Sequence, residues 1–225
     1  MKKSNMYLNT KTWNPFKGCL YDCSYCIPSF QKQAKRQMHN CMKCYEYTPH
    51  YHPERLNKIP KAETIFVCGN SDISFCEPSY IQKIIDAIKN KNKKNGEKNT
   101  YYFQSKNPLC LQPFLSQFPN NVILITTLET NKDIIYKNVS KAPLPSVRYN
   151  QFLNLNYPRK VVTIEPIMDF DLDIFSTWIL NIKPEYVWMG FNTRRKQISL
   201  IEPDKNKVKK LISVFNDNKI KVNWM

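Results

Sequence analysis

The amino-acid sequence predicts an α/β fold built on a parallel sheet. Apolar runs rich in β-branched and aromatic residues alternate with segments of helical periodicity along the 225-residue chain. The runs are almost continuously apolar, which is typical of strands buried on both faces of a sheet. Parallel strands need crossover connections, and the helical segments supply them. Six strand–helix units suit an open partial barrel, and the pattern alone also fits a doubly wound sheet.

The predicted elements follow one another in regular order. The first strand is expected at about Thr10–Pro15, and the last apolar run, Ile220–Trp224, is either a seventh strand or a tail. Between them we expect strands at Thr64–Gly69, Thr100–Ser105, Val122–Glu129, Lys160–Pro166 and Tyr186–Phe191, and helices at Pro78–Asn92, Pro108–Phe118, Ser146–Leu155, Leu172–Asn181 and Pro203–Asn216.

Two further segments are interpreted from their composition. Residues 24–38 are expected to be helical, with a polar face formed by Gln31, Lys32, Lys35 and Arg36. Lys89–Lys98 is rich in Lys and Asn and is expected to be a solvated loop at the end of a helix. Because no repeat or linker divides the sequence, residues 1–225 are expected to form a single domain, with a cysteine loop at 16–28 and a Cys/His insert at 38–56.

Composition indicates a packed globule. Hydrophobic residues make up 42% of the chain and aromatic residues 13%, which is too apolar for a disordered protein. No apolar run approaches the roughly 20 residues that a membrane-spanning helix needs. The amino terminus has lysines but no apolar segment behind them, so no signal peptide is expected. We therefore expect a cytoplasmic protein that does not contact membranes.

The chain is strongly basic. Lys and Arg number 34 against 18 Asp and Glu, giving a formal net charge of +16. A positive field of this size favours polyanionic partners, with DNA or RNA the first candidate. Only six of the basic residues are Arg, the better reader of phosphates and base edges. The Lys-rich composition, with abundant Asn and Ile, is equally typical of an AT-rich genome.

Three of the eight cysteines lie in one short stretch after the first strand. Cys19, Cys23 and Cys26 have the spacing Cys-x₃-Cys-x₂-Cys. Soft thiolate ligands select iron–sulfur clusters, zinc or Cu(I). A 4Fe–4S cluster normally takes four cysteines, so three would leave one iron open to another ligand. The alternatives are a zinc site, which prefers four ligands in two close pairs, or three incidental thiols.

A second cysteine pair lies close to all three histidines of the protein. Cys41 and Cys44 could bind zinc together with two of His39, His50 and His52. The alternative is a loop interrupted by prolines, with two free thiols and ordinary surface histidines.

Polar residues appear at the carboxyl end of one predicted strand after another. In α/β sheets ligands bind at this end, so a charged pocket formed by Asp72, Glu129 and Glu165 with Lys106 and two arginines is expected. Each has an individual alternative, because Asp72 could cap a helix, Lys106 could lie on the surface and Glu165 could pair structurally with an arginine. The strand-end residues are Asn70, Ser71 and Asp72; Gln104, Ser105, Lys106 and Asn107; Thr127 and Glu129; Thr163 and Glu165; and Asn192, Thr193, Arg194 and Arg195.

The cysteine spacing, with Tyr25 directly before the third cysteine, resembles the cluster loop of the radical S-adenosylmethionine (SAM) superfamily. The resemblance implies a partial (β/α)₆ TIM-like barrel with parallel strands and outer helices. It implies that Cys19, Cys23 and Cys26 hold a 4Fe–4S cluster whose open iron binds SAM, and that Tyr25 packs near the adenine. Cleavage of SAM would then give a 5′-deoxyadenosyl radical.

Short motifs elsewhere are similar to a small phage- and prokaryote-associated radical-SAM-like family with no assigned reaction. By analogy, Asn70, Ser71 and Asp72 contact the SAM amino group, in place of the more usual Gly-Gly-Glu. Ribose and carboxylate contacts are assigned to Ser105, Lys106, Thr127, Glu129 and Glu165. The matching motifs are Trp13-Asn14-Pro15, His52-Pro53-Glu54-Arg55-Leu56, Ile65-Phe66-Val67 leading to Asn70-Ser71-Asp72, and Thr163-Ile164-Glu165-Pro166.

The function expected from these features is that of a radical SAM enzyme that modifies or repairs a nucleic acid base. The resemblance also implies an electron donor, such as a flavodoxin or ferredoxin. Two alternatives stay open: a radical SAM enzyme acting on a small molecule or peptide, and a non-catalytic, zinc-bearing module that binds nucleic acid.

Overall fold

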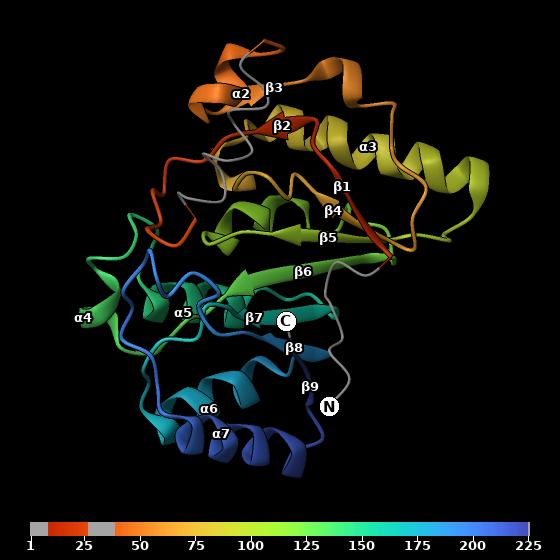
Figure 1. The fold of residues 1–225 in the computed structure, drawn as a ribbon. Helices are drawn as coiled ribbons and strands as arrows, with labels where there is room; N and C mark the ends of the chain where they lie inside the picture. The colour runs from red at the N-terminus through yellow and green to blue at the C-terminus, as the bar shows by residue number, and fades with distance from the viewer. Residues whose placement is uncertain (1–8, 27–38, 225) are drawn as a thin grey trace.

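A seven-stranded, fully parallel sheet forms the centre of the molecule (Figure 1). The computed structural model describes residues 9–26 and 39–224. The sheet curls into an open half-barrel, so the expected partial barrel is confirmed (Figure 1). The final apolar run is a strand and not a tail, because Lys221–Trp224 pairs with Tyr186–Met189. The strands run in the order β1 (Thr10–Trp13), β4 (Thr64–Val67), β5 (Thr100–Gln104), β6 (Val122–Thr127), β7 (Lys160–Ile164), β8 (Tyr186–Met189) and β9 (Lys221–Trp224).

The strands are buried on both faces, which explains their near-continuous apolar sequence. Every residue of β6 is buried. Its Val122 and Leu124 belong to the large core under the outer helices. Its Ile123 and Ile125 face the inside of the half-barrel. A small apolar cluster fills that inside and consists of Phe66, Tyr102, Ile123, Ile125, Val161 and Trp188.

Helices cover the outer side of the curled sheet (Figure 1). The longest of them, α3 (Pro78–Asn95), buries Ile81, Ile84, Ile85 and Ile88, whose spacing is that of one helical face. None of the described helices is long and apolar enough to cross a membrane. The α-helices that follow β4 are α3 (Pro78–Asn95), α4 (Asp133–Tyr136), α5 (Pro145–Asn154), α6 (Leu172–Ile182) and α7 (Lys205–Asp217).

Two expected segments differ in the structure. The expected loop at Lys89–Lys98 is wrong over most of its length, because α3 continues to Asn95 and ends at Gly96, where φ is +71°; Lys is a good helix former. The segment expected as a helix at Pro108–Phe118 is a 3₁₀ helix, η4 (Pro108–Phe114). Pro113 lies inside it and cannot supply the N–H of an α-helix. Of the helix expected at 24–38, residues 27–38 lie outside the described residues.

The connection between β1 and β4 carries a small hairpin that the sequence did not predict. Strand β2 (Phe16–Lys17) pairs antiparallel with β3 (His50–Tyr51). Between them lies α2 (Met42–Glu46), and β3 leads into the 3₁₀ helix η2 (Pro53–Arg55). The hairpin is anchored to the barrel through Trp13, whose indole N–H donates to the carbonyl oxygen of Arg55 at 2.8 Å.

Candidate functional site

A cavity of about 510 Å³ opens at the carboxyl ends of the strands. It is formed by the cysteine loop on one side and the strand ends on the other, so two parts of the sequence predicted separately as functional meet in one pocket. The aromatic rings of Tyr21, Tyr47, Phe66 and Phe191 complete its walls. The predicted site residues that line it are Cys19, Cys23, Tyr25, Cys26, Asn70, Ser71, Asp72, Lys106, Thr127 and Glu165.

The three cysteines of the loop all line this pocket. Backbone hydrogen bonds fix the loop: the Ser24 N–H donates to the Val139 carbonyl at 2.9 Å, and the Cys26 N–H to the Cys23 carbonyl at 2.8 Å. The three do not form a group whose ligand atoms all lie within 4.8 Å of one another; within the described ranges such a group occurs elsewhere. A single zinc ion, with Zn–S bonds of about 2.3 Å, would need that closeness.

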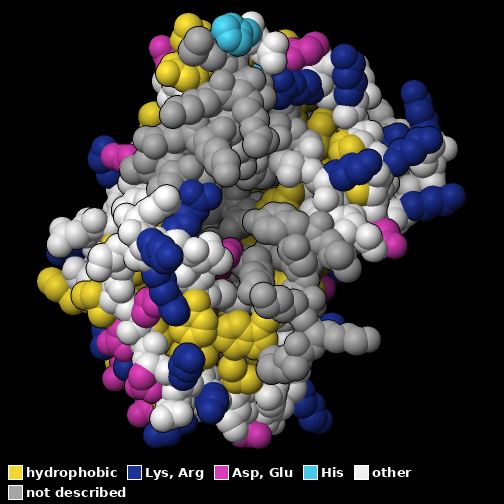
Figure 2. Space-filling model, in the orientation of Figure 1, with side chains coloured by type: hydrophobic (Ala, Val, Ile, Leu, Met, Phe, Trp, Pro, Cys, Tyr) yellow, Lys and Arg dark blue, Asp and Glu magenta, His cyan; other side chains and the backbone are white. Residues whose placement is uncertain are grey.

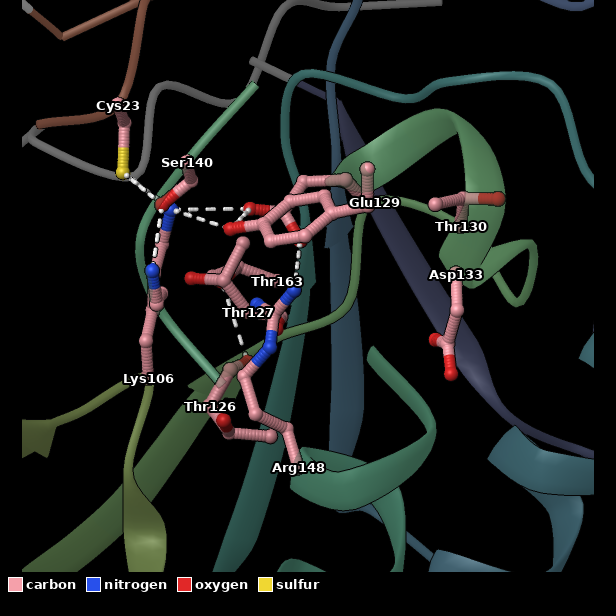
Figure 3. Close-up of polar contacts among 12 residues, drawn as sticks. Cys23, Lys106, Thr126, Thr127, Glu129, Thr130, Asp133, Ser140, Arg148 and Thr163 are labelled. Atoms are coloured by element: carbon pink, nitrogen blue, oxygen red, sulfur yellow. Dashed lines mark hydrogen bonds and ion pairs between the residues drawn. The ribbon is translucent and has the colours of Figure 1, made fainter. Parts of the chain in front are cut away.

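The Cys23 sulfur has two polar neighbours. The Lys106 ammonium donates to it at 3.2 Å, and the Ser140 hydroxyl lies 3.0 Å away (Figure 3). Hydrogen bonding with Cys26, together with Lys106 and Ser140, lowers the pKa of Cys23 to about 5 despite burial. A thiolate is the form that binds metal, so this sulfur is prepared as a ligand. By contrast, burial and the nearby Asp72 carboxylate raise the pKa of Cys19 to about 12.

A buried charge network lies directly behind the cysteine loop (Figure 3). The Glu129 carboxylate is fully buried, 3.0 Å from the Lys106 ammonium and 2.8 Å from the Arg148 guanidinium. The Tyr25 hydroxyl hydrogen-bonds to both Glu129 and Lys106. Burial alone would raise the pKa of Glu129, but Arg148 and Lys106 lower it to about 2. Burial likewise opposes the charge on Lys106, and Glu129 raises its pKa well above the ordinary value.

These contacts place Glu129 behind the pocket and not in its lining. Its carboxylate holds Lys106 beside Cys23, which is a positioning arrangement. Ser105 is also absent from the lining and is fully buried. Both residues were predicted to contact the SAM ribose or carboxylate, and in the described structure each supports a residue that does line the pocket.

Asp72 lines the pocket and also caps a short helix. Its carboxylate accepts from the Ser105 hydroxyl at 2.6 Å, the Lys106 backbone N–H at 2.8 Å and the Ser74 backbone N–H at 3.0 Å. The last contact caps the 3₁₀ helix η3 (Ile73–Phe75), the structural role that the sequence left open. The three donors fix the position of the Asp72 carboxylate at this end of the sheet.

The motif before the first cysteine connects the hairpin to the end of β4. The Asn14 side-chain oxygen accepts from the Asn70 backbone N–H at 3.2 Å. The Pro15 carbonyl accepts from the His52 backbone N–H at 2.6 Å. The Ser71 hydroxyl donates to the Cys68 carbonyl at 2.7 Å, so it is partly engaged by the backbone.

Side chains on neighbouring strands share a further polar network on the barrel's inner face. The Gln104 amide donates to the hydroxyls of Thr127 at 2.9 Å and Thr163 at 3.3 Å, and those hydroxyls lie 2.9 Å apart. Gln104 and Thr127 line the pocket. Because alternate residues of a strand share a face, the sequence could place Thr127 there.

Glu165 lines the pocket without an ion-pair partner among the described residues. The expected structural alternative, a pair with an arginine, is therefore absent from the part of the chain that the structure describes. Burial raises the pKa of this carboxyl above its ordinary value. A partly buried carboxyl facing an open pocket is typical of a group that binds ligand.

The second cysteine pair and its neighbouring histidines lie outside the pocket lining, on the hairpin. The structure brings Cys41, Cys44, His50 and His52 together, with all ligand atoms within 4.8 Å of one another. His39 is exposed and does not belong to the group.

Sequence reasoning did not single out Arg148, although it is fully buried and pairs with Glu129. One signal was present: a lone arginine stands among buried positions of α5, beside Tyr149 and Phe152. A buried arginine requires a carboxylate partner, and Glu129 at a strand end was available.

No family model matches the chain, and no curated protein matches it. Solved structures do. SuiB from Streptococcus suis has a TM-score of 0.61 at 7% identity over 96% of this chain, and a radical SAM methyltransferase from Sphaerobacter thermophilus has 0.60 at 10% over 92%. A spore photoproduct lyase variant has 0.60 at 8% over 95%.

The fold is that of the radical SAM enzymes. The resemblance seen in the sequence is thus confirmed at the level of fold. The chain spans 49% of SuiB, 63% of the methyltransferase and 75% of the lyase. A further lyase structure, with bound AdoMet and dinucleoside spore photoproduct, has a TM-score of 0.54 at 11% identity.

Proposed function

We propose that this protein is a radical SAM enzyme that modifies or repairs a nucleic acid base. One observation carries the proposal: on a half-barrel with the radical SAM fold, Cys19, Cys23 and Cys26 line the same pocket as the polar strand ends. Among the described residues, these three cysteines do not form a group whose ligand atoms all lie within 4.8 Å of one another.

The residues fit the cofactors that the fold implies. Cys19, Cys23 and Cys26 would hold the 4Fe–4S cluster, and Cys23 already has donors directed at its sulfur. Hydrogen bonds to ligand sulfurs are one of the means by which a protein tunes such a cluster. Asn70, Ser71, Asp72, Thr127 and Glu165 would bind SAM. When bound, this pair of cofactors supplies a 5′-deoxyadenosyl radical, which carries the difficult chemistry.

The chain's own residues position and shield the reacting groups. Glu129 and Arg148 fix Lys106, whose ammonium offsets thiolate charge at Cys23. Tyr25 closes the pocket on the side of this network. The apolar cluster inside the half-barrel includes Phe66, which lines the pocket and makes part of its wall apolar. Holding the reactants in a dry site is the main contribution a protein makes to cofactor chemistry.

A nucleic acid substrate is supported by three features. The chain carries a net charge of +16. Arg194 and Phe191 line the pocket, and arginine and aromatic side chains are typical contacts for an unstacked base. A spore photoproduct lyase of the same fold has been solved with a dinucleoside photoproduct.

Part of the basic charge lies far from the pocket. Figure 2 shows Lys and Arg side chains gathered over the far end of α3. That end precedes β5 and so lies at the amino ends of the strands. The functional contribution to nucleic acid binding should therefore come from the pocket rim and not from this lysine group.

Iron loading and SAM cleavage test the enzyme assignment. After anaerobic reconstitution and reduction, by dithionite or by an electron donor such as a flavodoxin or ferredoxin, the wild type should show a 4Fe–4S electron paramagnetic resonance signal that changes when SAM is added. It should release 5′-deoxyadenosine. Cys19→Ala, Cys23→Ala and Cys26→Ala should each abolish both. Cys110→Ala is the control, because this cysteine lies outside the pocket lining. Full activity in the three loop variants would contradict the assignment.

A binding comparison tests the substrate class. A peptide substrate is the rival, because SuiB has been solved bound to a precursor peptide and has a TM-score of 0.59 with this chain. Single-stranded oligonucleotides should bind with an affinity that falls steeply as salt rises, since counterions are released. Binding that does not respond to salt, or that is limited to peptides, would favour the rival. Zinc without iron in anaerobically purified protein would favour a non-catalytic module.

A further inference from the structure

We propose that Cys41, Cys44, His50 and His52 form a structural zinc site that fixes the start of the cysteine loop. The Cys44 sulfur lies 3.2 Å from Nε2 of both His50 and His52, and the Cys41 sulfur 3.5 Å from Nε2 of His50. The two Nε2 atoms are 2.9 Å apart. These four residues are called the Cys/His cluster.

Local structure explains why the four side chains converge. Cys41 is the N-cap of α2 and Cys44 lies in its first turn, so both sulfurs point to one side. His50 and His52 are alternate residues of an extended segment and share a face. Tyr51 points to the other face, where its ring lies 4.5 Å from the ring of Tyr80. The start of a helix and a short strand therefore bring the four side chains together, and neither element needs a metal to form its backbone structure.

The outer nitrogens of both histidines are already engaged. Nδ1 of His50 lies 2.7 Å from the Thr48 carbonyl, and Nδ1 of His52 lies 2.9 Å from the Glu54 carboxylate. Both partners only accept, so each Nδ1 carries the proton and each Nε2 presents a lone pair. Such partners on the outer nitrogen are the normal arrangement for histidines that bind metal.

The facing lone pairs are arranged to bind a cation between them. Two Nε2 acceptors at 2.9 Å repel one another, and the two cysteine sulfurs add further electron density. The histidines are largely buried, at 6% and 8% exposure, and Cys44 at 2%, so water cannot easily separate them. A divalent cation would be neutralised by two thiolates, which removes the cost of a buried net charge.

The ligand set selects zinc. Two sulfurs and two imidazole nitrogens around one point are the set of a tetrahedral structural zinc site. Bonds of about 2.0 Å to nitrogen and 2.3 Å to sulfur give ligand-to-ligand separations near 3.5 Å. The observed sulfur–nitrogen separations are 3.2–3.5 Å. With four protein ligands, the site has no open position for substrate.

The position of the Cys/His cluster explains what a zinc ion would do. His50 pairs with Lys17 across the hairpin, and Lys17 is followed by Gly18 and Cys19. The Cys19 N–H donates to the Tyr47 carbonyl at 3.3 Å. Tyr47 lies between Cys44 and His50 in the chain, so a metal bound by those residues would hold the segment on which Cys19 rests.

Metal analysis of the full-length protein tests the proposal. Wild type purified without added metal should contain about one zinc ion per chain. Cys44→Ser and His50→Ala should lower the zinc content by roughly tenfold or more. His39→Ala is the matched control, because this histidine is near in sequence, exposed and outside the cluster. Cys23→Ala should lose iron and keep its zinc.

Cobalt substitution of the wild type gives a second measurement that does not depend on the folding of variants. Zinc-stripped protein titrated with Co²⁺ should show thiolate-to-cobalt charge transfer and intense tetrahedral bands. Absence of zinc and of these bands in the wild type, or unchanged zinc in both Cys44→Ser and His50→Ala, overturns the proposal. The radical SAM assignment fails separately, through absence of iron and 5′-deoxyadenosine in protein that still binds zinc.

Discussion

The two cysteine-containing regions of this protein differ in how they are closed. The Cys/His cluster gathers four ligands within 4.8 Å, on the hairpin and away from the pocket. The cysteine loop spreads three ligands around a pocket of about 510 Å³. A site with all positions filled by protein suits structural metal, whereas catalysis needs an open position. Ligand number and spacing therefore separate the two roles more clearly than the presence of cysteine does.

The largest effect that separates the two regions is expected at Glu129. Glu129→Gln removes the only carboxylate paired with the buried Arg148 in the described structure and one of the two anions beside Lys106, and loss of one partner of a buried pair costs about 3–5 kcal/mol. Urea denaturation should show this loss, with iron loading reduced and zinc content unchanged. Lys106→Met is the control: Arg148 still neutralises Glu129, so we expect a smaller loss of about 1–3 kcal/mol. Equal losses in both variants would contradict the network described here.

Gly18 joins the two regions, and its substitution should damage both. It has φ +99°, and an added Cβ would lie 2.2 Å from the Thr48 carbonyl oxygen. Gly18→Ala should therefore lower the free energy of unfolding by about 2–4 kcal/mol and reduce both iron and zinc.

Gly96 provides a matched control for this change. It also has positive φ, at +71°, but nothing lies within 4 Å of an added Cβ. Gly96→Ala should cost only the backbone strain, about 1 kcal/mol, and leave both metals in place. A loss as large as that at Gly18 would show that strain and not the contact with Thr48 is responsible.

Glu165 should show a smaller effect of opposite sign. Burial raises its pKa, so its contribution to stability is fully present below the ordinary carboxyl pKa and is lost as the pH rises through the folded-state value. Glu165→Gln should raise the free energy of unfolding at neutral pH by about 0.5–1 kcal/mol. The difference should vanish below about pH 4.

Thermal melts over a pH series measure this difference, and calorimetry should show weaker SAM binding by the variant. Stabilisation that persists at acid pH would mean that the carboxylate charge is not its cause.

The smallest expected effect concerns the pocket rim. Arg194 lines the pocket, so Arg194→Ala should weaken oligonucleotide binding by roughly two- to threefold and reduce the salt slope by about 1. Lys93→Ala, at the far end of α3, should change neither. Fluorescence anisotropy at several salt concentrations makes the comparison. An equal effect of both changes would assign binding to general charge and not to the pocket.

The strands and their order along the chain could be predicted because each strand is a near-continuous run of apolar, β-branched and aromatic residues. Strand β6 is an example: its inner face carries Ile123 and Ile125, its outer face is also apolar, and every residue of the strand is buried. The β2–β3 hairpin could not be predicted, because it has two residues on each side and joins Phe16 to Tyr51 across a long separation. Such short pairing depends on the tertiary fold and leaves no periodic pattern.

The pocket was predicted better than the roles within it. Period-two alternation and the position of strand ends were sufficient to place Lys106, Thr127 and Glu165 in the lining. They could not show that Glu129 points to Arg148 on α5, because that contact joins residues of different elements. Likewise the sequence offered three histidines for Cys41 and Cys44, and only the folded hairpin separates His50 and His52 from His39.

The two regions also differ in how much of the chain must fold before they exist. The Cys/His cluster lies within residues 41–52, whereas the pocket reaches from Thr12 to Arg194. Contacts between near neighbours form earlier than distant ones. Zinc can therefore bind while later strands are still unstructured, whereas the complete pocket needs the residues that follow β8. In refolding followed by pulsed hydrogen exchange, amides of 41–52 should gain protection before those of β8 when zinc is present. Assembly of this protein would then proceed in two stages, with the Cys/His cluster formed before the pocket is complete.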